Sequence, residues 1–292
     1  MKILYISNFD LPDFQNDMIF HGARTLFGEN CVDYNEAWYM YDDMKQYWNH
    51  RVPENGMSYG RGFTLYGRLP KINIDRSNLY EKIKNKFFDI IIYGSIVRCN
   101  IFFDVVSSIY NKNNIIIIDG EDDSEIRSYY INKGIYFKRE LIHNPTNYLH
   151  PINFSIPEEL IVNKIPTKEK NYGEVIPGNP STYIFIDEIP YFKDYQKSYF
   201  GLTFKKGGWD CLRHYEILMN GCIPFFPNIE ECPPFTMEKF PKNLIIEINK
   251  FINNGNLNID IYNEYCSKCI EHTTKHLTTK SVFLNLLNNC IF

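Results

Sequence analysis

The sequence lacks the long apolar run and the leader segment that membrane-bound or secreted chains carry. No stretch of its 292 residues approaches the roughly 18 consecutive apolar residues that identify a membrane-spanning helix. Met1 and Lys2 lead directly into the apolar run ILYIS, without the architecture of a signal peptide. The eight cysteines are scattered, several of them within apolar runs. These features predict a cytoplasmic protein with reduced thiols and no transmembrane segment.

Several common sequence motifs are also absent. There is no Walker loop, no G-x-S-x-G nucleophile elbow, and no G-x-G-x-x-G after the first predicted strand. Charge is nearly balanced, because 31 Lys and Arg stand against 35 Asp and Glu, and no basic stripe is visible. The missing motifs disfavour a nicotinamide dehydrogenase. The charge pattern predicts that nucleic acid is not a partner.

The first half of the chain alternates predicted strands and helices. Two continuous apolar runs that end in polar residues, 88–96 and 114–122, are typical of parallel strands covered on both faces. The predicted strands are residues 2–7, 31–38, 88–96, 114–122 and 134–141, and the predicted helices are 17–26, 79–86 and 102–110. This alternation predicts a doubly wound α/β domain, whose ligands bind beyond the carboxyl ends of the strands. The aromatic, polar stretch 39–70 is expected to be irregular and to form part of an acceptor cleft.

A composition change divides the chain near its middle. Residues 142–180 are rich in Pro, Asn and Lys, as domain boundaries often are. We expect two Rossmann-like domains, residues 1–145 and 146–292, that face each other across a cleft. After the boundary the chain resumes with TYIFIDE and a helix near 190–198. Residues 243–253, 258–274 and 279–289 are expected to supply the closing strand and helices.

The most informative segment is residues 200–227, FGLTFKKGGWDCLRHYEILMNGCIPFFP. It reads as a strand, a glycine turn, a short helix and a second strand. Lys205 and Lys206 are expected to end the first strand, and Gly207 and Gly208 to form a tight turn with positive φ. Cationic groups and a helix N-terminus would then meet at one strand end. That combination predicts a site for an anion such as a diphosphate.

The predicted helix has recognisable ends and faces. Asp210 is expected to cap its start, and Gly221 to adopt a left-handed conformation just past its end. Leu212, Tyr215 and Met219 fall on one face and would pack on the sheet, while another face carries Trp209, Arg213 and Glu216. The second face admits two interpretations, a ligand-binding face or an ordinary surface ion pair.

This segment resembles the C-terminal half of GT-B glycosyltransferases, including the exostosin-like and CgeB-like groups and the group 1 type of C-terminal domain. The matching pieces are Gly208-Trp209, Glu216, Asn220-Gly221 and Ile223-Pro224. The chain departs from the broader group at Arg213-His214, beside the glutamate. Outside this segment the resemblance is diffuse.

The resemblance implies a glycosyltransferase, of hexosyltransferase type, in which the C-terminal domain holds a nucleotide-diphosphate sugar. Lys205, Lys206 and Arg213 would offset the charge on the diphosphate, which grows as it leaves. Glu216 would accept hydrogen bonds from the ribose, and the turn residues Gly207, Gly208 and Trp209 would lie against the donor. No cofactor beyond the donor substrate and no metal are implied. The acceptor would be a glycan, a glycoprotein or a small molecule.

In the N-terminal half, His21 follows the first predicted strand and is a candidate general base. It could equally be a helix-surface or capping histidine. Lys138 and Arg139 lie near another strand end, where at most one of them would reach the cleft. We expect Lys138 to contribute to phosphate binding.

Acidic residues follow the predicted strand 114–122. Asp119, Glu121 and Asp122 would contact the acceptor or orient the base. The alternative for residues 119–123 is a divalent metal site of the kind that GT-A glycosyltransferases use.

A protein without catalytic activity also fits the sequence. It would have two domains and bind a nucleotide or a glycan without chemistry.

The spacing of Cys266, Cys269, His272 and His276 resembles a zinc ligand set. These four residues fall within one predicted helix, which favours a structural role for them.

Overall fold

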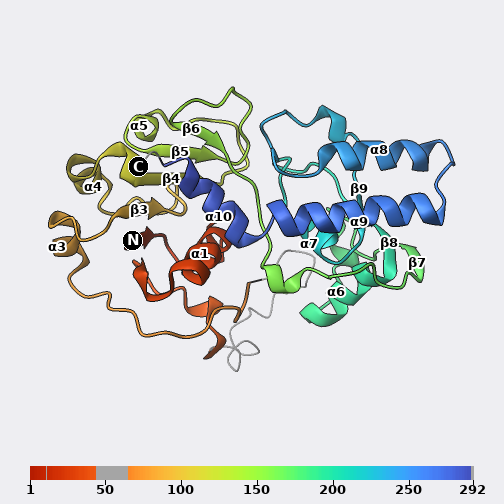
Figure 1. Ribbon diagram of the computed structural model, residues 1–292, viewed down its shortest axis with the longest axis horizontal. Coiled ribbons are helices and arrows are strands. Elements are labelled where there is room, and N and C mark those ends of the chain that lie inside the picture. The colour runs from red at the N-terminus through yellow and green to blue at the C-terminus, as the bar shows by residue number, and fades with distance from the viewer. Residues whose placement is uncertain (11, 44–64, 291–292) are drawn as a thin grey trace.

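The computed structural model describes residues 1–10, 12–43 and 65–290. The expected acceptor stretch 39–70 therefore lies largely outside the described residues. Figure 1 shows two parallel sheets side by side, with long helices in front of them. This arrangement confirms the α/β prediction.

The first sheet has six strands in the order β2-β1-β3-β4-β5-β6, all paired in parallel. The order reverses between β1 and β3, and such a switch point is where doubly wound sheets bind ligands. The strands are β1 (Ile3–Ile6), β2 (Cys31–Asp33), β3 (Ile90–Tyr93), β4 (Ile115–Asp119), β5 (Ile135–Lys138) and β6 (Leu149–Pro151). The five predicted strands are confirmed, each shorter than expected. The sequence pattern does not predict β6, which extends the first sheet past residue 145.

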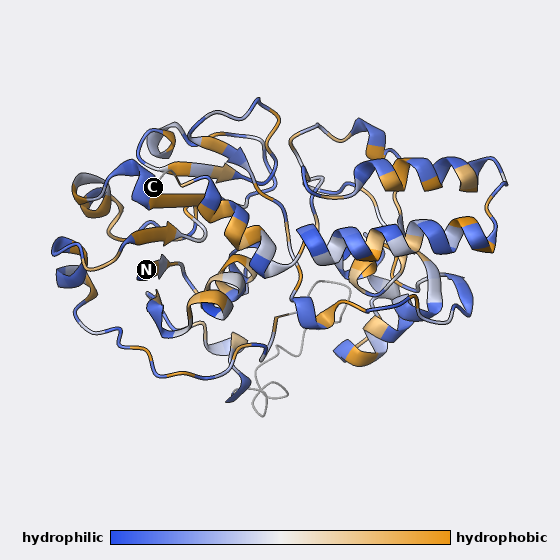
Figure 2. Cartoon of the chain, viewed as in Figure 1, coloured by the Kyte–Doolittle hydropathy of each residue, from blue (hydrophilic) through white to orange (hydrophobic). Residues whose placement is uncertain are grey.

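Alternate residues of the first sheet enter two separate hydrophobic layers. Ile92 and Ile116 pack on the side of α1 (Phe14–Phe27) and α10 (Thr279–Asn288), together with Phe20 and Phe283. Ile91 and Ile117 pack on the other side. The helices on that side are α3 (Leu79–Lys84), α4 (Phe103–Ile109) and α5 (Ser128–Ile131). Apolar colour along the strands in Figure 2 agrees with this double coverage, which explains the unbroken isoleucine runs.

The second sheet is small and also parallel, in the order β7-β8-β9. Its strands are β7 (Lys170–Tyr172), β8 (Ser198–Leu202) and β9 (Ile223–Phe225). The helices of this part are α6 (Glu188–Lys197), α7 (Leu212–Met219), α8 (Lys242–Asn253) and α9 (Ile259–His276). Residues 243–253 are helical, so the described structure contains no closing strand at this point. TYIFIDE lies outside the second sheet.

The two parts of the chain share one core. A single hydrophobic cluster runs from Ile3 and Phe20 in the first part to Leu218 and Ile248 in the second. Figure 1 shows α9 in the second part leading into α10, which returns to lie beside α1. The helical layer on this face of the first sheet is therefore completed by residues from the end of the chain.

Candidate active site

A cavity of about 410 Å³ opens where the carboxyl ends of the first sheet meet the loop before α7. That volume falls within the range of roughly 300–1,000 Å³ that is usual for ligand sites. Its walls come from segments that follow β1, β3, β4 and β5, and from the loop before α7. The lining residues are 12–15, Arg98, Gly120, Asp122, Arg139, Phe154, 206–208 and 210–213. The cavity lies at the sheet's switch point, where the topology predicts a ligand.

One wall of the cavity is cationic. Lys206 is exposed and Arg213 is 6% exposed, and both line the cavity together with the first residues of α7. The guanidinium carbon of Arg213 lies 5.6 Å from the centre of the Tyr183 ring. Arg213 and Glu216 are both buried, which excludes the surface ion-pair interpretation of this helix face, and of the two only Arg213 lines the cavity. This wall can hold an anion.

Lys205 and Lys206, which the sequence could not distinguish, have different environments. Lys206 lines the cavity. The ammonium nitrogen of Lys205 lies 5.3 Å from the centre of the Trp209 ring. Neither lysine ends a strand, because β8 stops at Leu202. Lys206 is therefore the lysine that can contact a ligand in the cavity.

The start of α7 differs from the prediction. Cys211 is its N-cap residue and, in the part of the chain that the structure describes, makes no capping hydrogen bond with its side chain. Asp210 does not cap the helix, because its carboxylate accepts hydrogen bonds from the Phe154 backbone at 3.0 Å and the Tyr215 hydroxyl at 2.8 Å. Gly221 has the expected left-handed conformation, with φ of 59°.

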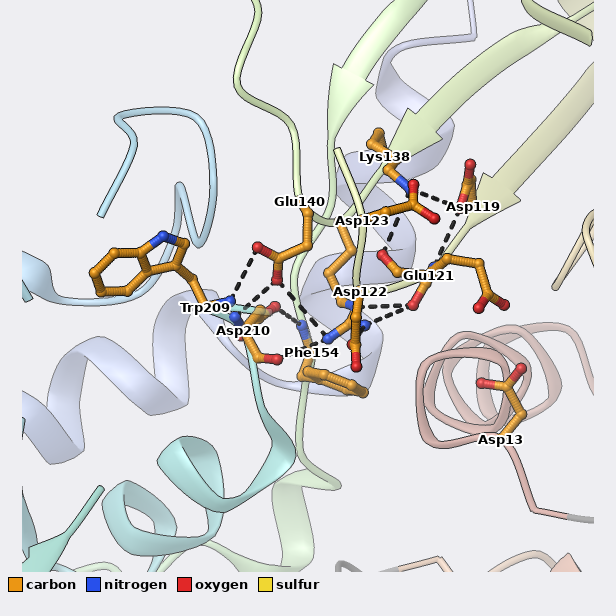
Figure 3. Close-up of polar contacts among 12 residues, drawn as sticks. Asp13, Asp119, Glu121, Asp122, Asp123, Lys138, Glu140, Phe154, Trp209 and Asp210 are labelled. Carbon is orange, nitrogen blue, oxygen red and sulfur yellow. Dashed lines mark hydrogen bonds and ion pairs between the residues drawn. The ribbon is translucent and has the colours of Figure 1, made fainter. Parts of the chain in front are cut away.

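The loop before α7 is attached to the first sheet by a buried polar network (Figure 3). The Glu140 carboxylate accepts hydrogen bonds from the backbone of Trp209 at 3.0 Å and of Asp210 at 2.9 Å. The Arg139 guanidinium donates to the Asp210 carbonyl at 2.7 Å and to the Gly120 carbonyl at 2.7 Å, and it also contacts Asp122. These contacts join the ends of β4 and β5 to the cationic wall of the cavity.

Burial perturbs the acids of this network. It raises the pKa of Asp210 to about 7, although Arg139 opposes the shift. Burial also raises the pKa of Glu140, against the two backbone N–H donors. Burial alone would lower the pKa of Arg139, but Asp210 and Asp122 outweigh it and raise that pKa. Arg139 therefore keeps its charge and offsets part of the acidity around it.

The acidic cluster 119–123 is largely neutralised by cations (Figure 3). Asp119 is fully buried, and its carboxylate pairs with Lys138 at 2.9 Å and accepts from Tyr136. Lys138 also pairs with Asp123 at 3.2 Å and is itself fully buried. Lys138 therefore stabilises the acidic turn and does not line the cavity, contrary to prediction. The neighbouring Arg139, the other candidate at this strand end, does line it.

The opposite wall of the cavity carries a second ion-pair chain. Arg98, which follows β3, lies 3.0 Å from Asp13 and 3.0 Å from Glu121. Asp13 also caps α1 by accepting from the Asn16 backbone. Asp13 and Arg98 line the cavity. Glu121 does not line it, but it accepts a hydrogen bond from Arg98. Polar groups at this wall face the cations of the α7 side.

His21 lies away from the cavity, in the interface between α1 and α10. Its ring nitrogen Nδ1 is 2.9 Å from the Thr279 hydroxyl, and the residue is 2% exposed. Burial lowers the pKa of His21 to about 4, with Arg68 and Lys280 adding to the shift. His21 is neither a cavity group nor a surface histidine, and this position does not support a general base.

Two further predicted donor contacts are occupied by the protein itself. Glu216 is fully buried and accepts a hydrogen bond from Tyr191 at 2.7 Å. Trp209 stacks on Phe226, with ring centres 6.1 Å apart. Neither residue lines the cavity. A ribose reaches Glu216 only if Tyr191 and its surroundings move.

His214 fixes the shape of the same loop. Its Nε2 lies 2.9 Å from the Trp209 carbonyl, which can only accept, so Nε2 carries the proton. Nδ1 then accepts from the Thr203 hydroxyl at 2.8 Å. Burial lowers the pKa of His214 to about 3, so the ring stays neutral at pH 7. The histidine at which the chain departs from the family pattern thus connects β8 to the loop.

Gly207 and Gly208 do not have the predicted positive φ. They let the loop approach two carboxylates closely instead. A Cβ atom at Gly208 would lie 2.5 Å from Glu140 Oε1, and one at Gly207 would lie 2.7 Å from Asp122 Oδ2. Both distances are too short for any other residue type without rearrangement.

No metal ligand set is found among residues 1–10, 12–43 and 65–290. Cys266 and Cys269 are buried in the core, and His272 contacts the Lys239 carbonyl at 2.7 Å. All eight cysteines are free thiols.

Among residues 1–10, 12–43 and 65–290, no helix has the length and apolar character that crossing a membrane requires.

Three residues of the site, Asp13, Arg98 and Glu140, were not expected from the sequence. Each follows or approaches a strand end of the first sheet, which is the available sequence signal. Nothing in the local sequence distinguishes these positions from ordinary surface charges. Their role depends on contacts such as that between Glu140 and Asp210, which are 70 residues apart.

Comparisons with known proteins give only a weak likeness. No family model matches this chain, and no curated protein matches it. Among solved structures, it is similar to an alpha-glucosyltransferase in complex with UDP and a 13-mer DNA containing a HMU base. The two are 12% identical with a TM-score of 0.46, and the alignment covers 99% of each chain. A likeness of this size transfers no activity, so the function of this chain has to be inferred from its own residues.

Proposed function

We propose that this chain is a GT-B-type glycosyltransferase, which moves a sugar from a nucleotide-diphosphate sugar to an acceptor without a metal ion. The observation that carries the proposal is the shared cavity. On one side it has Lys206, Arg213 and the start of α7, and on the other the carboxyl edge of a doubly wound sheet. Residues of the first part would bind the acceptor, and those of the second part the donor.

The cationic wall suits a departing diphosphate. Negative charge grows on the diphosphate as the glycosidic bond breaks, so preorganised cations stabilise the transition state more than the ground state. Lys206 and Arg213 supply two positive charges, and the first turn of α7 supplies backbone N–H groups. These groups do the work that a divalent cation does in metal-dependent enzymes.

The acceptor side is formed by Asp13, Arg98 and Asp122. Carboxylates accept hydrogen bonds from hydroxyl groups, and guanidinium groups donate to them, so this wall suits a hydroxylated acceptor. A glycan, a glycoprotein or a small molecule meets that description. Nucleic acid is not among the acceptors that we propose, because the chain has a net charge of −4 and no basic stripe in its sequence.

The metal-dependent alternative has less support. It requires the acidic cluster 119–123 to bind a metal ion, but Asp119 and Asp123 already form ion pairs with Lys138. Arg139 contacts Asp122. The non-catalytic alternative, a nucleotide- or glycan-binding protein, uses the same cavity and differs only in turnover.

The test begins with thermal-shift screening of UDP, GDP, dTDP and CMP sugars, because a ligand of the native state raises apparent stability. The sugar that binds is then incubated with a panel of hydroxylated acceptors, with and without a chelator. Transfer that survives chelation supports the proposal. Binding without transfer or donor hydrolysis favours the non-catalytic alternative, and no binding contradicts both.

A further inference from the structure

The two residues that follow β5, Arg139 and Glu140, hold the loop before α7 through hydrogen bonds to its backbone on both sides of Asp210. Glu140 accepts from the N–H groups of Trp209 and Asp210, at 3.0 and 2.9 Å. Arg139 donates to the carbonyl of Asp210 at 2.7 Å. Both Arg139 and Glu140 are 4% exposed, so water has little access to these bonds. Figure 3 shows the Glu140 carboxylate directed at the backbone of Trp209 and Asp210.

The rest of the local packing fits this attachment. The Arg139 guanidinium also donates to the Gly120 carbonyl at 2.7 and 3.0 Å and lies 4.8 Å from the centre of the Phe154 ring. Gly208 lets the loop approach Glu140 to a distance that a side chain would prevent. Arg139 is thus itself held by several contacts, and the loop lies directly against Glu140.

We propose that Glu140 and Arg139 are positioning residues, which hold residues 206–211 so that Lys206, Arg213 and the start of α7 converge on one diphosphate-bearing ligand. This inference rests on the proposed function and adds the residues on which the anion site depends. The first sheet thereby controls the donor side of the cavity, although Glu140 does not line it. Anion affinity then depends on a carboxylate whose own charge repels the anion.

The direction in which neutralising Glu140 changes anion affinity separates a positioning role from a simple charge effect. If Glu140 acted only through its charge, its neutralisation would strengthen anion binding, because a negative charge near the site would be removed. If it positions the loop, Glu140→Gln weakens anion binding. The new amide group places an N–H against a backbone N–H and breaks one of the two bonds.

The experiment compares Glu140→Gln with Glu125→Gln in the full chain. Glu125 also follows the first sheet's acidic turn, pairs with Arg127 and is exposed, and it does not contact the loop. Inorganic pyrophosphate is the probe, titrated by calorimetry. Hydrogen exchange at the Trp209 and Asp210 amides is measured on the same samples.

We expect Glu140→Gln to weaken pyrophosphate binding by about tenfold or more, the order expected for losing a hydrogen bond to a charged acceptor. Exchange at the two amides should accelerate, while exchange in β3 and β4 stays slow. Glu125→Gln should match the wild type in both measurements.

Equal or tighter pyrophosphate binding by folded Glu140→Gln overturns the inference, and so does unchanged exchange at the two amides. Should this variant fail to fold, Gly208→Ala tests the same attachment, because its added methyl group displaces the loop from Glu140. The proposed function fails separately, if the wild type binds neither pyrophosphate nor any nucleoside diphosphate.

Discussion

At the scale of single residues, the two adjacent lysines of the α7 loop have separate roles. Lys206 lines the cavity, whereas Lys205 lies over the Trp209 ring. A sequence cannot make this distinction, because neighbouring positions in an irregular loop follow no period. The difference arises from contacts between distant segments, because Glu140 holds the backbone of Trp209 and Asp210 directly after the two lysines and glycines.

The lysine pair supplies a matched test. Lys206→Ala should lower kcat/KM for the nucleotide sugar by roughly 10- to 100-fold, because it removes a charged contact with the diphosphate. Lys205→Ala removes the same charge from the same loop and should stay within a few-fold of the wild type. Steady-state kinetics of both variants checks this. Equal losses in the two would show that only the overall charge of the loop matters.

His21 shows how burial decides the role of an ionisable residue. Its position after β1 predicted a general base, but the helix turns the side chain toward α10. The folded protein lowers the pKa of His21 from 6.5 to about 4. Unfolding therefore takes up a proton below pH 6.5, and stability from this group is complete above that pH and is lost as pH falls toward 4.

The His21→Gln variant should lack this pH dependence. Between pH 7 and pH 5, the wild type should lose about 2 kcal/mol of unfolding free energy that the variant retains, given the size of the shift. Urea unfolding of both proteins at the two pH values measures the difference. A loss of turnover with an unchanged unfolding profile would restore the base hypothesis.

At the scale of elements, the sequence predicted those parts of the fold in which each segment shows its own pattern. The isoleucine runs of β3 and β4 indicate buried parallel strands. The pattern of residues 200–227 indicates a strand, a loop and the helix α7. β6 and β7 have only three residues each and no distinguishing pattern, so only pairing with β5 and β8 defines them. The partner of α1 could not be predicted either, because α10 lies at the other end of the chain.

The contact between α1 and α10 depends on Gly22. A Cβ atom there would lie 2.3 Å from the Thr279 carbonyl oxygen. Gly22→Ala should therefore destabilise the protein by about 1–3 kcal/mol, as overpacking does, although alanine favours a helix. Leu26→Ala, at a 37% exposed position of the same helix, is the control and should cost less. A Gly22→Ala variant more stable than the wild type would contradict this packing.

At the scale of the whole molecule, one hydrophobic cluster runs through both parts, and polar segments beyond the two sheets line one cavity. Both parts contribute cations to its lining, Arg98 and Arg139 from the first and Lys206 and Arg213 from the second. Local sequence signals identified Lys206, Gly207, Gly208, Arg213 and Asp122 as site residues, and all five line the cavity. The residues that assemble the site, Arg139, Glu140 and Asp210, depend on tertiary contacts that no local pattern encodes.

Metal removal tests the chemistry of the whole site. If Lys206 and Arg213 supply the positive charge, as we propose, transfer by the intact protein should be unchanged after dialysis against a chelator. Restoration of activity by Mg²⁺ or Mn²⁺ after such treatment would instead favour the acidic cluster 119–123. Rates of nucleotide release before and after chelation decide between the two.

The most direct test of the proposed donor site is a crystal structure of the chain with the nucleoside diphosphate that the thermal-shift screen selects. We predict diphosphate oxygens within hydrogen-bond distance of Lys206 and Arg213, at the start of α7, with no metal ion bound. A diphosphate held instead by a cation on Asp119, Asp122 or Asp123, or bound outside this cavity, would contradict the proposal.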